Sequence, residues 1–304
     1  MKKHLLFCLA FLAGLGMLLA LTSFLFFPKE ISAEAGLRFP SAYGYAAEPE
    51  NSLDAVVIGD SLPLYGINPL VIFREQGIAC YDCATPQQSL AKSRVFLTDI
   101  LRRQNPKLVL LETDVLYRSM HRLEPLTELL SWRIPVFAFH DNWKTLSPAQ
   151  LLRPIRWEQK SEQKGHFSTD AVEAAASADY MDREDPDAAI STDNQRQLRR
   201  FRDTCRSRGI SLVLVSVPNA ASWSKERHKA VNALAESLEL PYLDLNQEDL
   251  GIDWTTECLD KGDHLNEKGA RKVSAFLGRY LASTGLFPDR REDPAYASWL
   301  GEHQ

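Results

Sequence analysis

Short, uninterrupted runs of apolar residues recur along residues 51–285 and alternate with longer helical patterns. Such runs are typical of parallel strands buried on both faces, because a half-exposed strand alternates apolar and polar residues. Strands that alternate with helices predict a parallel sheet with helices on both faces, an α/β fold. The predicted strands are Ala55–Ile58, Ile78–Tyr81, Leu108–Glu112, Ser211–Val217 and Tyr242–Leu245, and the predicted helices are Pro69–Gln76, Gln87–Gln104, Thr192–Arg208, Lys225–Leu238 and Lys268–Ser283.

The N-terminus carries a second strong pattern. Residues 5–27 form a run of 23 residues without a charge, which as a helix would be about 35 Å long. The apolar part of a cleaved signal peptide is roughly 7–15 residues long, so the run favours an uncleaved transmembrane anchor, although Ala33-Glu34-Ala35 offers a weak cleavage site. Lys2 and Lys3 precede the run, and positive charge predicts a cytoplasmic N-terminus with the rest of the chain extracytoplasmic.

These patterns predict four parts of the chain. They are a cytoplasmic tip and transmembrane anchor (residues 1–28), a polar linker (29–50), the α/β domain (51–285) and a C-terminal tail (286–304). Residues 118–190 interrupt the strand–helix rhythm with a helical piece and a polar, acidic run. We expect this stretch to form an insertion or a lid.

Charge and cysteine content narrow the possible partners. Without Lys2 and Lys3 the chain has 33 basic and 40 acidic residues, which argues against a nucleic-acid partner. Cys80 and Cys83 form the one C-x-x-C pair, whereas structural zinc takes four ligands, so we expect no metal and no cofactor. A disulfide between these two cysteines is also not expected, because strand geometry rarely suits that spacing.

Polar residues follow four of the predicted strands. They are Gly59-Asp60-Ser61, the stretch from Asp82 to Gln88, Glu112-Thr113-Asp114, and Pro218-Asn219. In open parallel sheets, ligands bind at the carboxyl ends of the strands. The sequence therefore places a candidate site at this edge of the sheet.

A catalytic interpretation of Ser61 requires a base and a carboxylate that orients the base. His264 can supply the base, since it lies in a predicted loop before the last helix, with Asp260 and Asp263 on its N-terminal side. Neighbouring residues in an extended chain point in opposite directions, which favours Asp260 over Asp263 without excluding Asp263. The alternative is a plain turn serine and a loop histidine paired with Asp263.

These two blocks resemble the SGNH (GDSL-type) esterase superfamily over roughly residues 53–281. The resemblance is closer to its membrane-anchored branch, the DltD-type proteins and the SGNH-like partners of polysaccharide O-acetylation systems. It implies a flavodoxin-like, three-layer α/β/α fold, with Ser61 as nucleophile and His264 as base. It also implies acyl transfer on the hydroxyls of a cell-surface glycan or polymer, and a membrane-bound O-acyltransferase as partner.

The sequence departs from the superfamily in three places. The second-block glycine and the third-block Gly-x-Asn-Asp, which normally donate to the oxyanion, are absent, and Lys261 occupies the usual position of the acid. Weaker candidates for oxyanion or substrate contacts are Thr85, Gln87, Thr113, Asp114, Asn219, His140 and His228, each of which also has a plain structural interpretation. The missing donors support a second functional hypothesis, a polymer-binding or assembly factor that keeps the fold but not the reaction.

Overall fold

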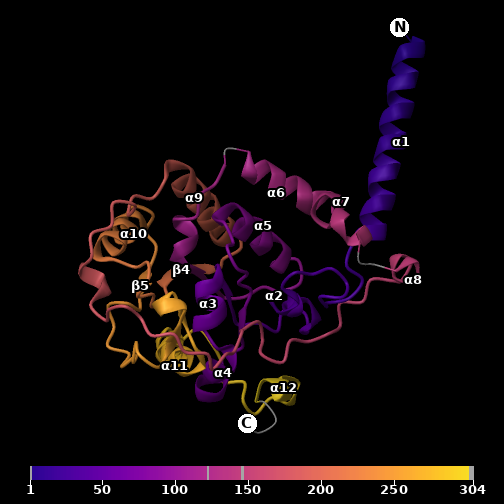
Figure 1. The fold of residues 1–304 in the computed structure, drawn as a ribbon. Coiled ribbons are helices and arrows are strands. Elements are labelled where there is room, and N and C mark those ends of the chain that lie inside the picture. Colours follow the sequence, from indigo (N-terminus) through magenta and orange to yellow (C-terminus); the bar gives the residue numbers. More distant parts are fainter. Residues whose placement is uncertain (1, 122, 145–146, 301–304) are drawn as a thin grey trace. The chain divides into compact units, whose positions relative to one another are not determined.

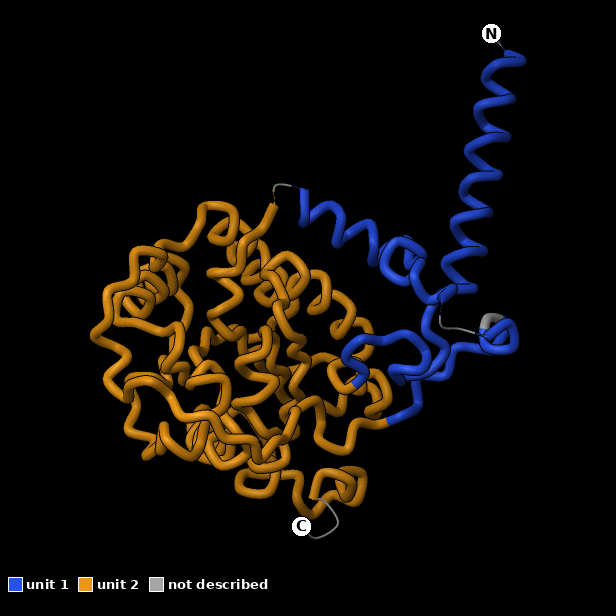
Figure 2. The backbone as a smooth tube through the Cα atoms, viewed as in Figure 1, with its two compact units in different colours: residues 1–40, 122–159 blue, residues 41–121, 160–304 orange. Residues whose placement is uncertain are grey.

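The structure is a computed structural model that describes residues 2–121, 123–144 and 147–300. The chain divides into two compact units, coloured separately in Figure 2. Unit 1 comprises residues 1–40 and 122–159, and unit 2 comprises residues 41–121 and 160–304. The interruption expected at residues 118–190 is therefore shared between the two units.

A five-stranded parallel sheet lies at the centre of unit 2 (Figure 1). All neighbouring strands run parallel, with Val57 opposite Leu110 in the central pair. The sheet and its flanking helices confirm the predicted fold class. In spatial order the strands are β2 (Cys80–Asp82), β1 (Ala55–Ile58), β3 (Leu108–Glu112), β4 (Ser211–Ser216) and β5 (Tyr242–Asp244).

Helices cover the sheet because its strands are apolar on both faces. Every residue of β1 and β3 is buried. On one face, Ile72 of α4 (Pro69–Gln76) and Val273 of α11 (Glu267–Ser283) join Val57 and Leu110 in one core cluster. The other face is covered by α5 (Leu90–Ile100), α9 (Thr192–Ser207) and α10 (Lys225–Ser237). The connections through these helices run across the sheet toward β5, opposite in direction to the connection from β1 to β2 through α4. Because such connections are right-handed, the two directions place their helices on opposite faces.

Several boundaries differ from the sequence prediction. The helix expected over residues 87–104 covers only Leu90–Ile100, because Ser89 caps its start and Gln87 has a φ of 55°. Strand β2 begins at Cys80, two residues later than expected. A small antiparallel pair, β6 (Cys258–Leu259) and β7 (His264–Leu265), was not foreseen.

The segments on either side of the α/β domain also contain ordered structure. Residues 40–47 form the short helices α2 (Pro40–Tyr43) and η1 (Gly44–Ala47), in which Tyr45 is buried. Near the C-terminus, the buried Trp299 lies 5.5 Å from the ring of Phe73. The remaining short elements of unit 2 are α3 (Ser61–Gly66), η2 (Thr113–Leu116), η4 (Tyr180–Asp182), η5 (Asp260–Gly262), η6 (Pro294–Tyr296) and α12 (Ala297–Leu300).

Unit 1 is built around the N-terminal helix. Helix α1 (Lys2–Phe26) is long and apolar enough to cross a membrane. The second stretch of this unit contains α6 (Glu124–Arg133), α7 (Val136–Phe139), η3 (His140–Lys144) and α8 (Pro148–Leu151). Figure 1 shows α7 at the C-terminal end of α1, with α6 extending away from it.

Candidate active site

Ser61 is the first residue of helix α3, three positions after the end of β1. The buried Asp60 is the N-cap, and its Oδ1 accepts a hydrogen bond from the Leu62 N–H at 3.0 Å. The turn is tight at Gly59, where an added Cβ would lie 2.6 Å from Pro63 and 2.7 Å from Glu112. The local sequence therefore holds Ser61 at the carboxyl edge of the sheet.

His264 reaches the same edge from the other end of the chain. Its Nε2 lies 2.9 Å from the Ser61 Oγ, and its Nδ1 lies 2.9 Å from the Asp260 Oδ2. A serine, a histidine and a carboxylate are thus joined in series at hydrogen-bonding distance. This is the geometry in which imidazole takes a proton from a serine hydroxyl while the carboxylate fixes its tautomer.

A left-handed turn makes this arrangement possible. Asp260, Lys261 and Gly262 have φ angles of 51°, 58° and 88°, and non-glycine residues rarely adopt such values. The turn brings the Asp260 carboxylate back onto the imidazole four residues later. Backbone strain of this kind tends to be retained at functional sites.

Asp263 lies farther from the imidazole than Asp260. Its Oδ2 is 3.6 Å from the His264 Nδ1, beyond hydrogen-bonding distance. Its Oδ1 accepts a hydrogen bond from the Asn219 Nδ2 at 3.1 Å. Asp260 is therefore the residue placed to orient His264, and Asp263 is held by its own amide partner.

The residue after the β6–β7 pair fixes the start of the last helix. Asn266 caps α11 by accepting hydrogen bonds from the Lys268 and Gly269 N–H groups. Its amide Nδ2 donates to the carbonyls of Ala171 and Thr256 at 3.2 and 2.9 Å. These bonds fix the backbone two residues beyond His264, and asparagine is a favoured residue at a helix N-cap.

Aromatic rings border the triad on one side. The ring of Tyr65 lies 4.7 Å from the His264 imidazole and 5.1 Å from the ring of Phe167, which is 51% exposed despite its apolar character. Burial and the nearby Asp260 carboxylate raise the pKa of Tyr65, which keeps its phenol protonated at neutral pH. Tyr65 and Phe167 thus form a partly exposed aromatic wall beside His264.

A buried carboxylate cluster lies behind the nucleophile. Arg118 donates from Nε to the Asp60 Oδ2 at 2.9 Å, and its Nη2 lies 3.0 Å from the Asp114 Oδ2. Glu112 accepts the Asp114 N–H at 2.9 Å. Burial raises the pKa of Glu112 well above its usual range, and burial and the Asp60 charge raise the pKa of Asp114 to about 7. Arg118 could not be singled out from the sequence, because its partner Asp60 lies 58 positions away in the chain.

Two of the expected oxyanion residues have other partners, and a third is exposed to solvent. Thr85 is buried. Its backbone N–H donates to the Gly59 carbonyl at 3.2 Å, and its hydroxyl donates to the Gln88 Oε1 at 2.8 Å. Gln87 points into solvent at its left-handed position. The buried Thr113 hydroxyl lies 2.5 Å from the Ser216 Oγ. Within the described residues, no hydrogen bond links these three side chains to Ser61 or His264.

Asn219 and His228 lie at the β4–β5 part of the same edge. The Asn219 Oδ1 accepts the N–H groups of Ala221 and Ser222, so both ends of its amide have partners. The His228 Nδ1 lies 2.7 Å from the Asp244 Oδ2, which also accepts the Trp223 indole N–H. His228 thus has an orienting carboxylate of its own.

His140 belongs to unit 1. Its side chain is exposed, and its Nδ1 lies 3.2 Å from the Phe137 carbonyl one turn earlier. These contacts are local to its short helical segment.

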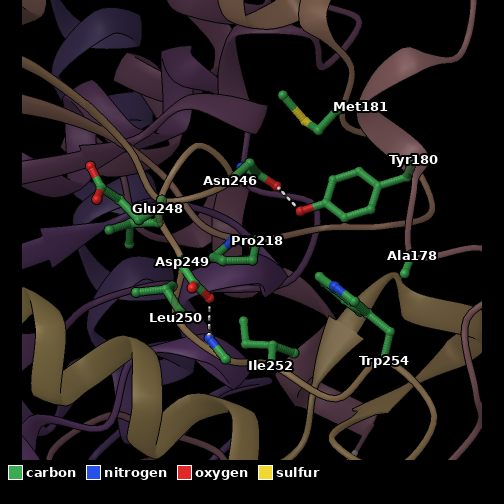
Figure 3. Close-up of a pocket in the computed structure, with 12 residues that line it drawn as sticks. Ala178, Tyr180, Met181, Pro218, Asn246, Glu248, Asp249, Leu250, Ile252 and Trp254 are labelled. Atoms are coloured by element: carbon green, nitrogen blue, oxygen red, sulfur yellow. Dashed lines mark hydrogen bonds between the residues drawn. The ribbon is translucent and has the colours of Figure 1, made fainter.

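A pocket of about 220 Å³ opens at the carboxyl ends of β4 and β5 (Figure 3). Tyr180 and Trp254 line it with rings 5.2 Å apart, and Figure 3 shows the Tyr180 hydroxyl bonded to the Asn246 amide. The same Asn246 Oδ1 accepts the Asn219 N–H at 3.0 Å. Because Asn219 in turn holds Asp263, one chain of hydrogen bonds links this pocket to the triad loop.

A larger cavity, of about 840 Å³, lies on the α4–α11 side of unit 2. Glu267, three residues after His264, lines it and accepts hydrogen bonds from His166 at 3.0 Å and Ser168 at 2.8 Å. Burial opposes ionisation of Glu267, but these hydrogen bonds lower its pKa to about 2. The cavity also contains Arg74, Lys160 and Arg271, so it presents both signs of charge.

Among the described residues, no group of three or more His, Cys, Asp or Glu side chains is arranged to hold a metal ion. Cys80 and Cys83 are free thiols, and burial raises the pKa of both.

This protein therefore belongs to the class of three-layer α/β proteins, and it has a Ser–His–Asp hydrogen-bond chain at the carboxyl edge of its sheet. No family model and no curated protein matches the sequence. The chain is similar in structure to several solved proteins of 10–13% sequence identity. The fold class and the chemistry therefore rest on the sheet and on the hydrogen bonds of this chain itself.

Three of these solved structures illustrate the similarity. A lipase/acylhydrolase from Enterococcus faecalis is 13% identical, with 76% of this chain and 97% of that chain covered and a TM-score of 0.41. A GDSL-like lipase from Bacteroides thetaiotaomicron is 11% identical, with coverages of 80% and 96% and a TM-score of 0.41. An acetyl xylan esterase from Butyrivibrio proteoclasticus is 10% identical, with coverages of 79% and 66% and a TM-score of 0.38.

Proposed function

We propose that this protein is a serine esterase or O-acyltransferase that works through an acyl-enzyme on Ser61. The observation that carries the proposal is the series of two 2.9 Å contacts from Ser61 through His264 to Asp260. Serine alone is a weak nucleophile, and this arrangement is what activates it.

The first half of the reaction acylates the serine. The Ser61 Oγ attacks the carbonyl carbon of an ester while its proton passes to the His264 Nε2. The tetrahedral intermediate then collapses, the bond to the leaving alcohol breaks, and His264 returns the proton to that alcohol. The Ser61 N–H, at the first position of α3, has no acceptor within its own helix and can donate to the oxyanion.

The second half releases the acyl group. Water or the hydroxyl of an acceptor gives its proton to His264 and attacks the acyl carbon, and Ser61 leaves as the regenerated hydroxyl. Water makes the enzyme an esterase, and an acceptor hydroxyl makes it a transferase.

The proposed substrate is an O-acyl group on a cell-surface polysaccharide or related polymer. The resemblance to the O-acetylation branch supports this class. So does the Tyr180–Trp254 pocket, because aromatic faces suit sugar rings and its Glu248 and Asp249 carboxylates can accept hydrogen bonds from sugar hydroxyls. A membrane-bound O-acyltransferase is the proposed partner that supplies acyl groups.

The proposed location is the outer face of a cell membrane, with α1 retained as a single-pass anchor. The end of α1 supports retention over cleavage, because it is packed within unit 1. The Phe27 ring stacks on Trp157 at 5.4 Å, and the Asn142 amide donates to the Phe26 carbonyl at 3.0 Å. Cleavage after Ala35 would remove these partners.

A reporter fusion tests the topology. A reporter that works only after export, fused after Gln304, should be active, and a cytoplasmic reporter at the same position should be silent.

A fluorophosphonate probe tests the reaction. The wild-type protein should be labelled on Ser61 and should hydrolyse a small activated acetyl ester, whereas Ser61→Ala should do neither. Equal labelling of the wild type and Ser61→Ala would remove Ser61 as the nucleophile. Adding an oligosaccharide acceptor separates the two chemistries, since only a transferase would produce acylated sugar.

The alternative function is a non-catalytic polymer-binding or assembly factor. The specific observation in its favour is that Thr85 and Thr113 are committed to other partners, and loss of one oxyanion donor can cost about 10²–10³ in rate. A protein that neither labels nor turns over, yet whose deletion strips acyl groups from the cell surface, would establish this alternative.

A further inference from the structure

Helix α6 of unit 1 has no buried residue, although it is rich in leucine. Leu126, Leu129 and Leu130 are 53%, 39% and 41% exposed, and Leu123 just before the helix is 61% exposed. Their spacing of three and four residues places them on one side of the helix, with Glu124 among the polar residues on the other. In water such a stripe is unfavourable, by roughly 25 cal/mol for each Å² of apolar surface left exposed.

Other parts of unit 1 also expose large apolar side chains. Phe137, Trp143, Leu152 and Ile155 are 49%, 62%, 74% and 47% exposed. This many exposed apolar residues in one unit is typical of a surface that meets a membrane or another protein. We call the described residues 123–144 and 147–157 of unit 1 the apolar foot.

The apolar foot is attached to the end of α1. The Val136 N–H donates to the Ser23 Oγ at 3.2 Å, and the rings of Phe139 and Phe27 meet edge to face at 5.5 Å. In addition, the Trp157 indole N–H donates to the carbonyl of Pro28, just past the end of α1, at 3.1 Å. The foot and the last turn of α1 therefore form one packed structure.

This attachment identifies what covers the apolar foot. If α1 spans the membrane, its C-terminal end emerges at the outer interface, and residues packed against it lie at the same depth. Figure 1 shows α6 and α7 leaving the end of α1 instead of running alongside it. Such a helix would lie in the plane of the interface, where leucine, phenylalanine and tryptophan partition favourably.

Basic residues accompany the exposed apolar ones. Arg133 ends α6, and the exposed Arg153 and Arg156 flank Ile155. Arginine side chains can reach lipid phosphates while their stems stay in apolar surroundings. This combination fits a phospholipid surface better than it fits an apolar protein groove.

We propose that the apolar foot is a membrane-interfacial surface that lies in the outer leaflet beside α1. The proposal rests on the proposed anchor topology, and it is independent of the reaction at Ser61. It gives part of the expected insertion at residues 118–190 a role as a lipid contact.

Environment-sensitive labels on the full chain test the proposal. The protein is reconstituted into nanodiscs of phosphatidylethanolamine and phosphatidylglycerol, with Cys8→Ser as background, and an NBD fluorophore is attached through Leu126→Cys or Leu130→Cys. The other four cysteines are buried and should not react. Lys229→Cys, on exposed surface of α10 in unit 2, is the matched control.

Labels at positions 126 and 130 should lose roughly half of their fluorescence to doxyl-labelled lipids and should resist aqueous dithionite. The label at position 229 should behave in the opposite way. A label on Cys8 of the wild type checks separately that α1 is inserted. If Cys8 is quenched by lipid while positions 126 and 130 react with dithionite, the proposal is overturned, and a protein partner becomes the candidate occupant. Ester turnover on the same preparation reports independently on the reaction proposed for Ser61.

Discussion

The Nε2 atom of His264 lies 2.9 Å from the Oγ atom of Ser61, although 203 positions separate the two residues in the chain. Ser61 opens the helix after the first strand, and His264 belongs to the small hairpin before the last helix. The parallel sheet brings both segments to its carboxyl edge. The distance makes a direct proton transfer from serine to imidazole possible, and it can be tested by substitution.

Ser61 and His264 should act as one unit. We expect Ser61→Ala, His264→Ala and the double variant to lose the same amount of kcat/KM on an activated acetyl ester, because either change removes the same step. Ser222→Ala, a serine at the same edge of the sheet, is the control and should retain activity. Additive losses in the double variant would contradict a shared mechanism. The stability of Ser61→Ala should fall by at most about 1 kcal/mol.

Asp260 should matter more than Asp263. Asp260→Asn removes the charge that is 2.9 Å from the imidazole, and general acid–base catalysis typically contributes about 10²–10⁴ in rate. We expect kcat to fall within that range for Asp260→Asn and by less than about tenfold for Asp263→Asn. Steady-state kinetics on both variants decides, and a larger loss in Asp263→Asn would reverse the assignment.

Arg118 should stabilise the fold behind the nucleophile. Arg118→Met leaves the buried carboxylates of Asp60 and Asp114 without their shared cation. Removing one partner of a buried pair costs about 3–5 kcal/mol. Arg118 is 35% exposed, so solvent screening reduces the expected loss to about 2 kcal/mol. The matched control is Arg196→Met, which breaks an exposed pair with Asp193 and should cost less than about 1 kcal/mol. Equal costs by urea denaturation would count against the cluster as a stabilising feature.

Glu267 should make stability depend on pH in the acidic range. Its pKa in the folded protein, about 2, lies below its ordinary value of 4.5. The ionised carboxylate therefore stabilises the fold above pH 4.5, and this contribution, on the order of 3 kcal/mol, is lost as the pH falls from about 4.5 to about 2. Urea midpoints measured between pH 3 and 7 should fall with acid in the wild type and fall less in Glu267→Gln. Identical slopes would show that Glu267 is not the group responsible.

Cys80 and Cys83 should remain thiols in the folded protein. Both are buried, and burial raises their pKa values, which disfavours the reactive thiolate. Mass spectrometry of the unreduced protein should find no bond between them, and maleimide should modify them only after denaturation. A Cys80–Cys83 disulfide would require a different end for strand β2.

The strand–helix alternation could be predicted because it depends on local composition. The runs at Ala55–Ile58 and Leu108–Glu112 are apolar throughout, and both became strands with the predicted bounds. The ends of other elements depended on single backbone conformations, such as the positive φ of Gln87 ahead of α5, that residue type alone does not reveal.

The candidate site also has features that the sequence predicts and features that only the tertiary structure determines. The sequence by itself singled out Ser61, His264 and the two acids, because a nucleophile, a base and an orienting carboxylate are recognisable residue types at strand ends and helix starts. It also determined the apolar N-terminal helix. Tertiary structure decided that Asp260 contacts His264 more closely than Asp263 does, because that choice depends on a left-handed turn at residues 260–262. It also decided that Thr113 is paired with Ser216 and that Arg118 lies against Asp60, because these pairs join residues 103 and 58 positions apart, and such separations say nothing about distance in space.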